Sequence, residues 1–535
     1  MGAGFVNLLS RDQHVDRASD KAVGGEPWDI LVIGGGATGV GIAVDAASRG
    51  YAVCLLEQAD FGKGTSSRST KLVHGGVRYL KQGNLPLVRE ALHERALLLR
   101  NAPHVVRDLP FIIPCPSWWQ AFFYGTGLKL YDLLAGRDNL GKSRRLSRAQ
   151  VLQRVATLDS RQCVAGILYH DGQFDDTRLL INLAQTAAGQ GACLINYARV
   201  TGVLKSDSGQ VSGVRWIELE SGREIESRAR VVINATGPFC DTIRRLDDPN
   251  ATAIVAASQG IHLVLPKHFL PGNTAIMVPK TSDGRVVFLI PWHDRVVLGT
   301  TDTPIDHASL EPTAQADEID FLLSTAGDYL PSAPQRSDIL SVFTGIRPLV
   351  VAAPGAHTSR LSRDHTISHS PNGLLTITGG KWTTYRKMAE DCVNQAAELA
   401  GLQRQACRTH ALRIAGAPPE TDIRPESIST ELHVYGSDQK HLDLLAQTDP
   451  EKARRLDERL PVTAAQVLWA VRSEMARSVE DVLARRTRAL FLDAAAALDV
   501  APRVAAIMAA ELQRDDAWQQ SQLAAFEQTA QHYLP

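Results

Sequence analysis

Three glycines at the spacing G-x-G-x-x-G follow an apolar run near the start of the chain. Gly34 permits a tight turn, Gly36 lets the backbone approach a pyrophosphate, and Gly39 lets a helix lie close to the preceding strand. A second apolar run ends in Glu57, whose carboxylate would accept hydrogen bonds from a ribose diol and repel a 2′-phosphate. These residues predict binding of FAD or NAD rather than NADP. The contacts are expected from Gly34, Gly35, Gly36, Ala37, Thr38, Gly39 and Glu57.

The sequence around the glycines predicts the elements that would hold them in place. Residues 30–33 and 52–56 are apolar runs typical of buried strands, and residues 40–48 carry apolar side chains at helical spacing. A helix that begins directly after the turn offers free N–H groups and a partial positive charge to a pyrophosphate. By itself the glycine spacing is equally typical of an ordinary glycine-rich turn, but the strand–turn–helix–strand order favours a dinucleotide site.

Two further stretches have the composition of ligand-binding loops. Residues 60–80 are too rich in hydroxyls, glycines and cations for a core element, and after a nucleotide-binding unit they can donate hydrogen bonds to a pyrophosphate or flavin. A predicted strand at residues 374–377 ends in a second glycine-rich junction, residues 379–388, which opens a helix as far as Leu399. Such a junction also suits anionic or electron-rich groups.

Composition excludes several function classes. The 535 residues allow two or three domains, and 44% hydrophobic and 21% charged residues are typical of a globular protein. A formal net charge of −1 gives no electrostatic reason to expect a nucleic-acid partner. Seven scattered cysteines without a C-x-x-C pair predict reduced thiols in a cytoplasmic protein and no metal site. No run of about 18 apolar residues occurs, and residues 1–26 are polar, so we expect neither a membrane span nor a signal peptide.

Two segments allow more than one interpretation. Residues 114–134 are rich in aromatic side chains and typical of a packed helix pair. The alternative is an interfacial segment that dips into a bilayer, because Trp and Tyr favour the headgroup level. Residues 416–535 have a largely helical pattern and predict a separate domain. Within it, Arg485, Arg486 and Arg488 are predicted to lie on a solvated helix face, with attraction to anionic lipid as the alternative.

Taken together, the motifs resemble those of the FAD-dependent sn-glycerol-3-phosphate dehydrogenase family. Their order and spacing match from residue 29 to residue 398, and the helical tail is similar to the cap domain of that family. The matching segments are residues 34–39, 65–67, 71–80, 234–238, 260–262, 290–292, 299–302, 345–349, 363–364 and 379–387.

The resemblance implies a fold, a cofactor and a reaction. The fold is α/β, with a Rossmann-like FAD-binding domain of the amine-oxidase and hydroxylase type, an inserted antiparallel β substrate domain and a C-terminal helical cap. Short β-like runs between residues 261 and 300 also predict that antiparallel sheet. The implied reaction is oxidation of glycerol 3-phosphate to dihydroxyacetone phosphate by hydride transfer to FAD, with electrons passed to a quinone.

These patterns also suggest domain boundaries. We expect an N-terminal extension at residues 1–26, an FAD-binding domain at 27–110, 165–245 and 340–400, a substrate-binding domain at 111–164 and 246–339, and a helical domain at 410–535. The extension has no counterpart in the short bacterial forms of the family, and we assign it no function.

Substrate residues are assigned by the resemblance together with simple chemistry. A phosphate dianion needs convergent cations, for which arginine is best suited, and a secondary alcohol needs a base such as neutral histidine. By resemblance, His262 is the base and His74 the second candidate. Arg347 and Arg363 clamp the phosphate, and Lys381 holds substrate or stabilises negative charge on the reduced flavin. Arg78 and Tyr79 line the site.

Further contacts to FAD are expected from the same motifs. They come from Thr65, Ser66, Ser67, Lys71, His74, Gly75, Gly76, Ala235, Thr236, Gly237, Gly380, Lys381, Thr383 and Thr384. Alternatives exist, because His262 in an apolar strand is also typical of a core histidine, and Arg347 before Pro348 is also typical of a loop salt bridge. The sequence departs from the family pattern at Gln259, where the resemblance leads us to expect a lysine.

Three other functions compete with this interpretation. A glycerol-3-phosphate oxidase would pass the electrons to oxygen and form peroxide. An amine oxidase of the same fold would need a carboxylate clamp but not several cations. A non-enzymatic flavin- or nucleotide-binding protein would keep the glycine turn without the cations that accompany His262. We further expect a homodimer that associates peripherally with the inner face of the cytoplasmic membrane.

Overall fold

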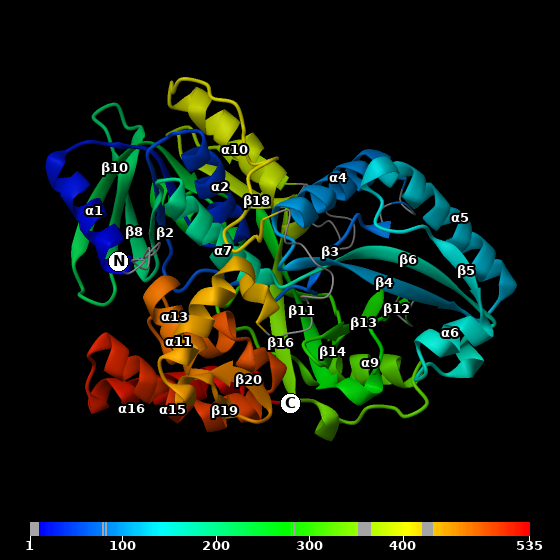
Figure 1. The fold of residues 1–535 in the computed structure, drawn as a ribbon. Coiled ribbons are helices and arrows are strands. Elements are labelled where there is room, and N and C mark those ends of the chain that lie inside the picture. Colours follow the sequence, from blue (N-terminus) through cyan, green and yellow to red (C-terminus); the bar gives the residue numbers. More distant parts are fainter. Residues whose placement is uncertain are drawn as a thin grey trace.

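A computed structural model of the chain describes residues 10–77, 80, 83–279, 281, 284–350, 365–419 and 432–535. These residues form two large sheets and a C-terminal helical domain (Figure 1). Arg78, Tyr79 and Arg363, which the sequence assigns to the substrate site, lie outside the described residues.

The first sheet carries the glycine turn at the end of its central strand. Strand β1 (Trp28–Ile33) pairs in parallel with β10 (Glu224–Asn234) on one side and with β2 (Val53–Leu56) on the other. Both faces of β1 are covered, so its residues are almost all apolar and buried. The order continues through β18 (Leu375–Gly379) and β17 (His365–His369) at one edge and β7 (Cys193–Ile195) at the other, and β8 (Ala198–Lys205) and β9 (Val211–Glu218) extend β10.

Helices cover both faces of this sheet. On one face, α2 (Ala37–Ser48) packs against α7 (Asp176–Gly189) and α10 (Tyr385–Leu399), as Figure 1 shows. A Cβ on Gly41 would lie 2.8 Å from the Tyr385 ring, so a glycine is needed for this close contact. On the other face, α1 (Arg11–Gly24) buries its apolar side chains beside β1 and β7. The N-terminal extension therefore contributes a helix to this sheet.

The second sheet is mainly antiparallel. Its order is β15 (Thr303–Ile305), β11 (Val255–Pro266), β14 (Arg295–Gly299), β13 (Val287–Trp292), β12 (Ala275–Val278), β4 (Val106–Cys115), β6 (Ala165–Phe174) and β3 (Leu72–Val73), while β16 (Ser341–Val350) pairs with β11 and β5 (Arg144–Ser147) with β6. Strands β6 and β16 lie in this sheet, although the expected boundaries place them in the FAD-binding domain. The reason is long-range pairing, since β6 pairs with β4 and β16 with β11 along their whole lengths.

Helices pack on this sheet as well. One group consists of α4 (Leu85–Asn101) and α5 (Trp118–Ala135), and the other of α6 (Arg148–Arg154) and α9 (Ala316–Gly327). The aromatic residues 118–135 thus form one long helix and not the expected helix pair. Its outer face leaves Trp119, Phe122 and Leu133 exposed by 72%, 64% and 76%. Among the described helices, none is both long and apolar enough to cross a membrane.

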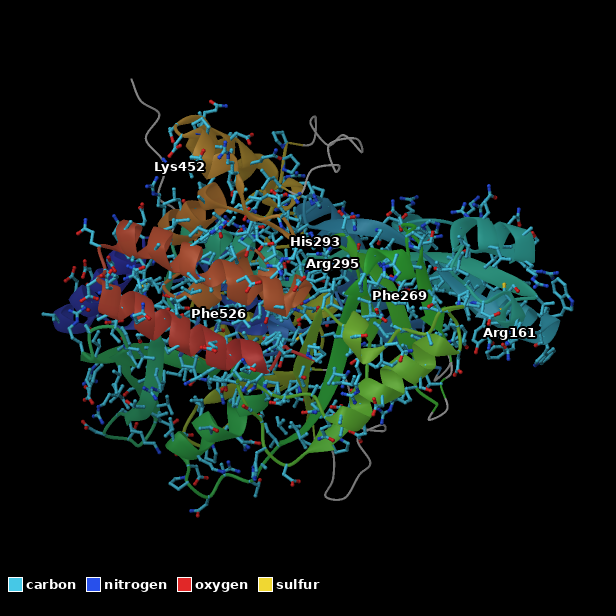
Figure 2. All side chains as sticks on the ribbon, turned by 90° about the horizontal axis from the view of Figure 1, so that it is seen from below. Arg161, Phe269, His293, Arg295, Lys452 and Phe526 are labelled. Carbon is cyan, nitrogen blue, oxygen red and sulfur yellow. The ribbon has the colours of Figure 1, made fainter. Side chains whose placement is uncertain are left out.

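The C-terminal domain lies against both sheets (Figure 1). It contains α11 (Gln439–Gln447), α12 (Pro450–Ala453), α13 (Ala464–Ser473), α14 (Ala489–Leu492), α15 (Ala494–Leu512), α16 (Asp516–Gln531) and the hairpin of β19 (Arg455–Asp457) and β20 (Leu460–Thr463). In Figure 2, His293 and Arg295, at the start of β14, lie between the labels of Phe526 in this domain and Phe269 after β11. Arg295 Nη2 donates to the Arg459 carbonyl at 3.0 Å, which ties the two parts together.

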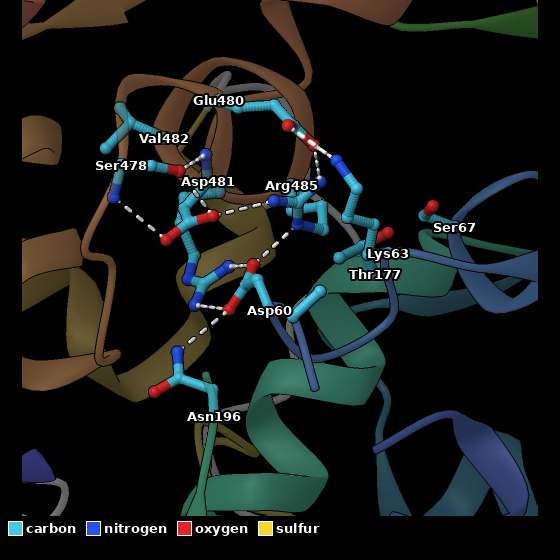
Figure 3. A network of polar contacts seen from close by, with 12 residues as sticks. Asp60, Lys63, Ser67, Thr177, Asn196, Ser478, Glu480, Asp481, Val482 and Arg485 are labelled. Carbon is cyan, nitrogen blue, oxygen red and sulfur yellow. Dashed lines mark hydrogen bonds and ion pairs between the residues drawn. The ribbon is translucent and has the colours of Figure 1, made fainter. Parts of the chain in front are cut away.

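Three arginines predicted to be solvated are buried at this junction. Arg485, Arg486 and Arg488 are each only 3% exposed. Asp60 accepts hydrogen bonds from Arg485 Nε at 2.5 Å and from Arg486 Nη1 at 2.7 Å (Figure 3). Arg488 Nη2 donates to Asp175 Oδ1 at 2.6 Å. The predictions of a solvated face and of lipid attraction are therefore wrong, because buried carboxylates hold these arginines. Asp60 follows β2 of the first sheet, and Asp175 follows β6 of the second sheet.

Candidate active site

The glycine turn forms a tight cradle at the N-terminus of α2. Gly34 has a φ of 109°, which favours glycine. A Cβ on Gly34 would lie 2.7 Å from the Ala235 carbonyl oxygen, and one on Gly39 would lie 1.9 Å from the Gly34 carbonyl oxygen. The helix begins at Gly36 without a side-chain cap, and the Ala37 N–H donates to Ser66 Oγ at 2.9 Å. Uncapped N–H groups and a nearby hydroxyl are the donors that a pyrophosphate requires.

Glu57 closes one side of this cradle. Its carboxylate accepts hydrogen bonds from the Gly35 N–H at 2.6 Å and from the Ala59 N–H at 2.8 Å. Burial raises the pKa of Glu57, and the two N–H donors oppose that rise. A carboxylate has about four acceptor sites, so it retains capacity for ribose hydroxyls. The donors of the cradle and this acceptor together fit the pyrophosphate and ribose of FAD.

A cavity of about 710 Å³ is lined by strands of both sheets and by the loops between them. It contains several residues that the sequence assigns to substrate or cofactor: Thr65, His74, Gly76, His262, Arg347, Gly380, Lys381 and Thr383. One part of its wall is apolar, with Leu72, Phe111, Met277 and Phe288. The fold therefore gathers segments from four distant parts of the chain around one cavity.

His262 projects from β11 at the inner end of this cavity. Its Nε2 lies 2.9 Å from Thr70 Oγ1, and its ring stacks on Phe343 with 4.8 Å between centroids. The opposite strand carries Gly299, where a Cβ would lie 2.3 Å from the His262 ring. Burial, followed by the charges of Lys71 and Arg347, lowers the pKa of His262 well below its usual value. The imidazole is thus neutral at physiological pH, as a base must be.

Arg347 projects from β16 on the same side of the sheet. Its Nη1 donates to Asp302 Oδ1 and to the Gln259 carbonyl, both at 3.2 Å. Its Nη2 donates to Thr300 Oγ1 at 3.1 Å and to the Thr301 carbonyl at 3.0 Å. The side chain remains 27% exposed, so a planar guanidinium held at several points still faces the cavity.

The loop after β18 ties the cavity to the first sheet. Lys381 precedes a short helical turn, Trp382–Thr384, and lines the cavity. Trp382 Nε1 donates to the Ser66 carbonyl at 2.9 Å, and the His74 N–H donates to Thr383 Oγ1 at 3.2 Å. The second glycine-rich junction therefore lies against residues 65–74.

Several residues assigned to FAD do not line the cavity. Ser66 lies on the glycine cradle, while Ser67, Gly75 and Thr384 are buried. Lys71 is fully buried, and its Nζ donates to Asp176 Oδ2 and to the Ser67 carbonyl, both at 2.7 Å. Burial lowers the pKa of Lys71 to about 8, with Asp176 opposing that shift. The structure thus turns Lys71 away from the cavity and behind Phe343, whose ring lies 4.9 Å from Nζ.

The structure also adds residues that sequence reasoning did not single out. Thr70 contacts His262, while Thr300 and Asp302 hold Arg347. All three belong to motifs noted in the sequence, namely residues 60–80 and 299–302, so hydroxyl and acid residues within those motifs were the available signal. Their partners lie far away in sequence, and only the fold identifies them.

The side chain of Gln259 does not take part in this site. It is 4% exposed, and its Nε2 donates to Glu318 Oε2 at 2.6 Å. Strand alternation places its side chain on the opposite face of β11 from His262. A lysine in its place would therefore face Glu318 and not the substrate cavity.

Comparison with known proteins identifies the class that this fold and site define. The model of the FAD dependent oxidoreductase family matches residues 29–386, and the model of the C-terminal domain of alpha-glycerophosphate oxidase matches residues 375–519. The class is thus that of FAD-dependent oxidoreductases, and the expected fold, including the C-terminal helical domain, is confirmed.

Individual relatives identify the family within this class. The mitochondrial glycerol-3-phosphate dehydrogenase of Homo sapiens is 41% identical over 95% of this chain and 73% of its own. That of Arabidopsis thaliana is 40% identical over 94% and 86%. The structure of glycerol-3-phosphate dehydrogenase from Bacillus halodurans, complexed with FAD, matches with a TM-score of 0.80 and 28% identity over 99% of both chains. The chain belongs to the glycerol-3-phosphate dehydrogenase family of these flavoproteins.

Proposed function

We propose that this protein oxidises sn-glycerol 3-phosphate to dihydroxyacetone phosphate and passes the electrons to a quinone. The observation that carries this proposal is the pairing of a neutral histidine, His262, with a guanidinium, Arg347, in one cavity beside the glycine cradle. The family supports it, because relatives of about 40% identity are named glycerol-3-phosphate dehydrogenases.

Some residues of the cavity bind the substrate, and another accepts its proton. Arg347 offers a planar guanidinium to the phosphate, and Lys381 adds a second cation. His262 accepts the hydroxyl proton, because its neutral form persists well below its ordinary pKa. FAD, when bound along the glycine cradle, supplies the hydride acceptor. We assign Arg78, Tyr79 and Arg363 to the same site by resemblance alone.

The electron acceptor separates two related activities. A quinone ring is apolar and flat, and the apolar wall formed by Leu72, Phe111, Met277 and Phe288 suits its approach. The alternative is an oxidase that passes electrons to oxygen. The match to the C-terminal domain of alpha-glycerophosphate oxidase is consistent with this alternative.

One anaerobic experiment tests the substrate and the acceptor. The purified yellow protein is mixed with glycerol 3-phosphate, with glycerol and with amino acids, and the flavin absorbance is followed. We expect bleaching by the phosphate ester alone, followed by reoxidation with a soluble quinone faster than with air. Reoxidation by air at the faster rate would favour the oxidase, and a flavin that stays oxidised with the phosphate ester would refute the proposed substrate.

We also propose that α5 places the protein on a membrane surface. Large exposed apolar patches mark interaction sites, and Trp119, Phe122 and Leu133 form one on the outer face of this helix. Four exposed cations follow α5 in the sequence, namely Lys142, Arg144, Arg145 and Arg148. The Arg145 guanidinium lies 4.3 Å from the Trp118 ring centroid. Aromatic and cationic side chains together suit an anionic bilayer surface. The inner face of the cytoplasmic membrane and a homodimer remain our expectations.

A further inference from the structure

His262 makes few polar contacts for a base that must reach a substrate. The imidazole is 2% exposed, and its Nδ1 is buried without a hydrogen-bond partner among the described residues. Its Nε2 lies 2.9 Å from Thr70 Oγ1. On either side, the ring is packed against Phe343 and the backbone of Gly299. The hydroxyl of Thr70 is therefore the polar contact between His262 and the rest of the cavity.

Thr70 itself reaches the cavity. Its side chain is half-buried, and it lines the same cavity as Arg347 and Lys381. It lies in the loop between a short helical turn, Thr65–Ser67, and β3. This loop contacts β16, because Thr65 Oγ1 donates to the Ile346 carbonyl at 2.6 Å. A hydroxyl can donate one hydrogen bond while it accepts two others, so Thr70 can contact His262 and a substrate hydroxyl at once.

The two neutral forms of His262 have different consequences. If Nε2 carried the proton, it would donate to Thr70, and the basic lone pair would be on buried Nδ1, out of reach of any substrate. If Nδ1 carries the proton, Nε2 accepts a hydrogen bond from Thr70, and the base is connected to the cavity. Only the second form lets His262 act as a base.

We propose that Thr70 is a catalytic relay that carries the substrate proton to His262. This inference depends on the proposed oxidation of glycerol 3-phosphate. The Thr70 oxygen accepts the proton of the substrate hydroxyl while its own proton moves to His262 Nε2. One O–H bond of the substrate and one of Thr70 break, one O–H bond of Thr70 and one N–H bond of His262 form, and the hydride leaves for FAD. Thr70 ends the step unchanged.

The charges around His262 keep its ring neutral before the reaction. Lys71 lies behind Phe343, and Arg347 lies on the neighbouring strand β16. Both lower the pKa of His262, in addition to burial. Before the reaction the ring is therefore neutral, and in its Nδ1–H form Nε2 can receive a proton.

The relay predicts distinct behaviour for two substitutions at Thr70. Thr70→Val keeps the shape but removes the hydroxyl, so anaerobic flavin reduction by glycerol 3-phosphate should slow by about 10²–10⁴-fold, the usual range for lost acid–base catalysis. Thr70→Ser keeps a hydroxyl and should stay within a few-fold of wild type. Thr344→Val, which removes a buried hydroxyl beside Phe343 on β16, is the matched control and should leave the rate unchanged.

Two readouts separate a relay from a merely structural role. In a double-mutant cycle, Thr70→Val and His262→Gln should not add, because both interrupt the same proton transfer. In ¹⁵N spectra of histidine-labelled wild-type holoenzyme, with His262→Gln used for assignment, the Nδ1–H form should be present. FAD content and melting temperature of each variant report on folding.

Several outcomes would overturn the relay. These are wild-type rates and pH dependence in Thr70→Val, full additivity in the cycle, a slow Thr70→Ser, or an Nε2–H form in the spectra. The spectra come from wild-type protein, so they show which nitrogen of His262 carries the proton even if Thr70→Val does not fold. If wild-type flavin is not reduced by glycerol 3-phosphate at all, the proposed function is wrong. If it is reduced and Thr70→Val matches it, only the relay is wrong.

Discussion

Gly260 lies so close to Arg347 that a side chain at position 260 would occupy the place of the guanidinium. A Cβ there would lie 2.4 Å from Arg347 Nη2 and 2.6 Å from the Thr301 carbonyl oxygen. The guanidinium could change its conformation, but the Thr301 carbonyl is part of the backbone and accepts a hydrogen bond from Arg347. The position of Arg347, the cation proposed to bind the phosphate, therefore depends on the absence of a side chain on the neighbouring strand β11.

Gly260→Ala should consequently weaken substrate binding. Complete loss of a charge-assisted contact of about 1.5–3 kcal/mol would raise KM for glycerol 3-phosphate by about 10–150-fold, and displacing Arg347 should raise KM by up to that amount. Steady-state kinetics of the purified holoenzyme measure this. Gly189→Ala, at the end of α7 with nothing within 4 Å of the new Cβ, is the control. Equal KM values for the two variants would show that the contact is unimportant.

Direct replacement of Arg347 gives a graded series. Arg347→Ala removes the whole charge-assisted contact and should raise KM by at least as much as Gly260→Ala, while Arg347→Lys keeps the charge but loses the planar fork and should lie between wild type and Arg347→Ala. With a substrate that carries a carboxylate in place of the phosphate, the difference in KM between these variants should be smaller. Unchanged KM and kcat in Arg347→Ala would remove Arg347 from the site.

The buried charge of Lys71 should appear in the pH dependence of flavin reduction. His262 acts in its neutral form, and its pKa is lowered by burial and then by Lys71 and Arg347, so the wild-type rate should stay constant as the pH falls through 6.5. Lys71→Met removes one positive charge and raises the pKa of His262, which moves the acid limb to higher pH. Asp176 keeps Arg488 as a partner in this variant.

Lys71→Arg serves as the control for the pH experiment. It keeps the charge behind Phe343, and its acid limb should stay near that of wild type. Stopped-flow flavin reduction between pH 5 and 9 measures all three proteins. An acid limb that does not move in Lys71→Met would show that the charge of Lys71 does not act on His262.

The parts of the site that the sequence predicts are those with local causes. The turn at Gly34–Gly39 and Glu57 are recognisable because the glycine spacing, the flanking strands and the acid lie within about 30 residues. Alternation along β11 could also have placed Gln259 opposite His262, since residues three apart in a strand face opposite sides.

Long-range partners could not be predicted in the same way. Thr70 and His262 are 192 residues apart, and Arg485 and Asp60 are 425 apart. A cluster of arginines on a helix is usually solvated, and nothing local in residues 485–488 reveals the carboxylates that cover it. The long pairing of β16 with β11 likewise moved residues 341–350 into the second sheet.

The buried pairing of Asp60 should matter for stability. Burial alone would raise the pKa of Asp60, but Arg486 and Arg485 outweigh it and hold that pKa well below its usual range. Asp60→Asn removes the carboxylate that the two buried guanidiniums share, although Arg485 keeps Glu480 and Asp481 as partners. Breaking a buried pair lowers the free energy of unfolding by about 3–5 kcal/mol. Denaturant unfolding of the holoenzyme measures the effect.

An exposed ion pair provides the matched comparison for Asp60. Arg336 and Asp320 lie 2.7 Å apart with side chains 46% and 65% exposed. Asp320→Asn should change the free energy of unfolding by less than about 1 kcal/mol, because water screens surface pairs. Equal losses in Asp60→Asn and Asp320→Asn would mean that the buried network of Figure 3 does not stabilise the junction.

The exposed face of α5 should bind anionic vesicles. Trp119→Glu with Phe122→Glu puts two negative charges on that face, so co-sedimentation with vesicles of anionic phospholipid should fall sharply, because both the apolar contact and the attraction to the lipid are lost. Flavin reduction by glycerol 3-phosphate should not change, since neither residue lines the cavity.

Two controls separate the apolar and the electrostatic parts of this binding. Asp320→Asn, on α9, should leave sedimentation unchanged. Arg144→Gln with Arg148→Gln should weaken binding to anionic vesicles, and high salt should have the same effect on wild type, because the Debye length shortens to about 3 Å at 1 M salt. If the two glutamates on α5 leave vesicle binding intact, the membrane contacts another surface, and the aromatic face of α5 must serve a protein partner or a second copy of the chain.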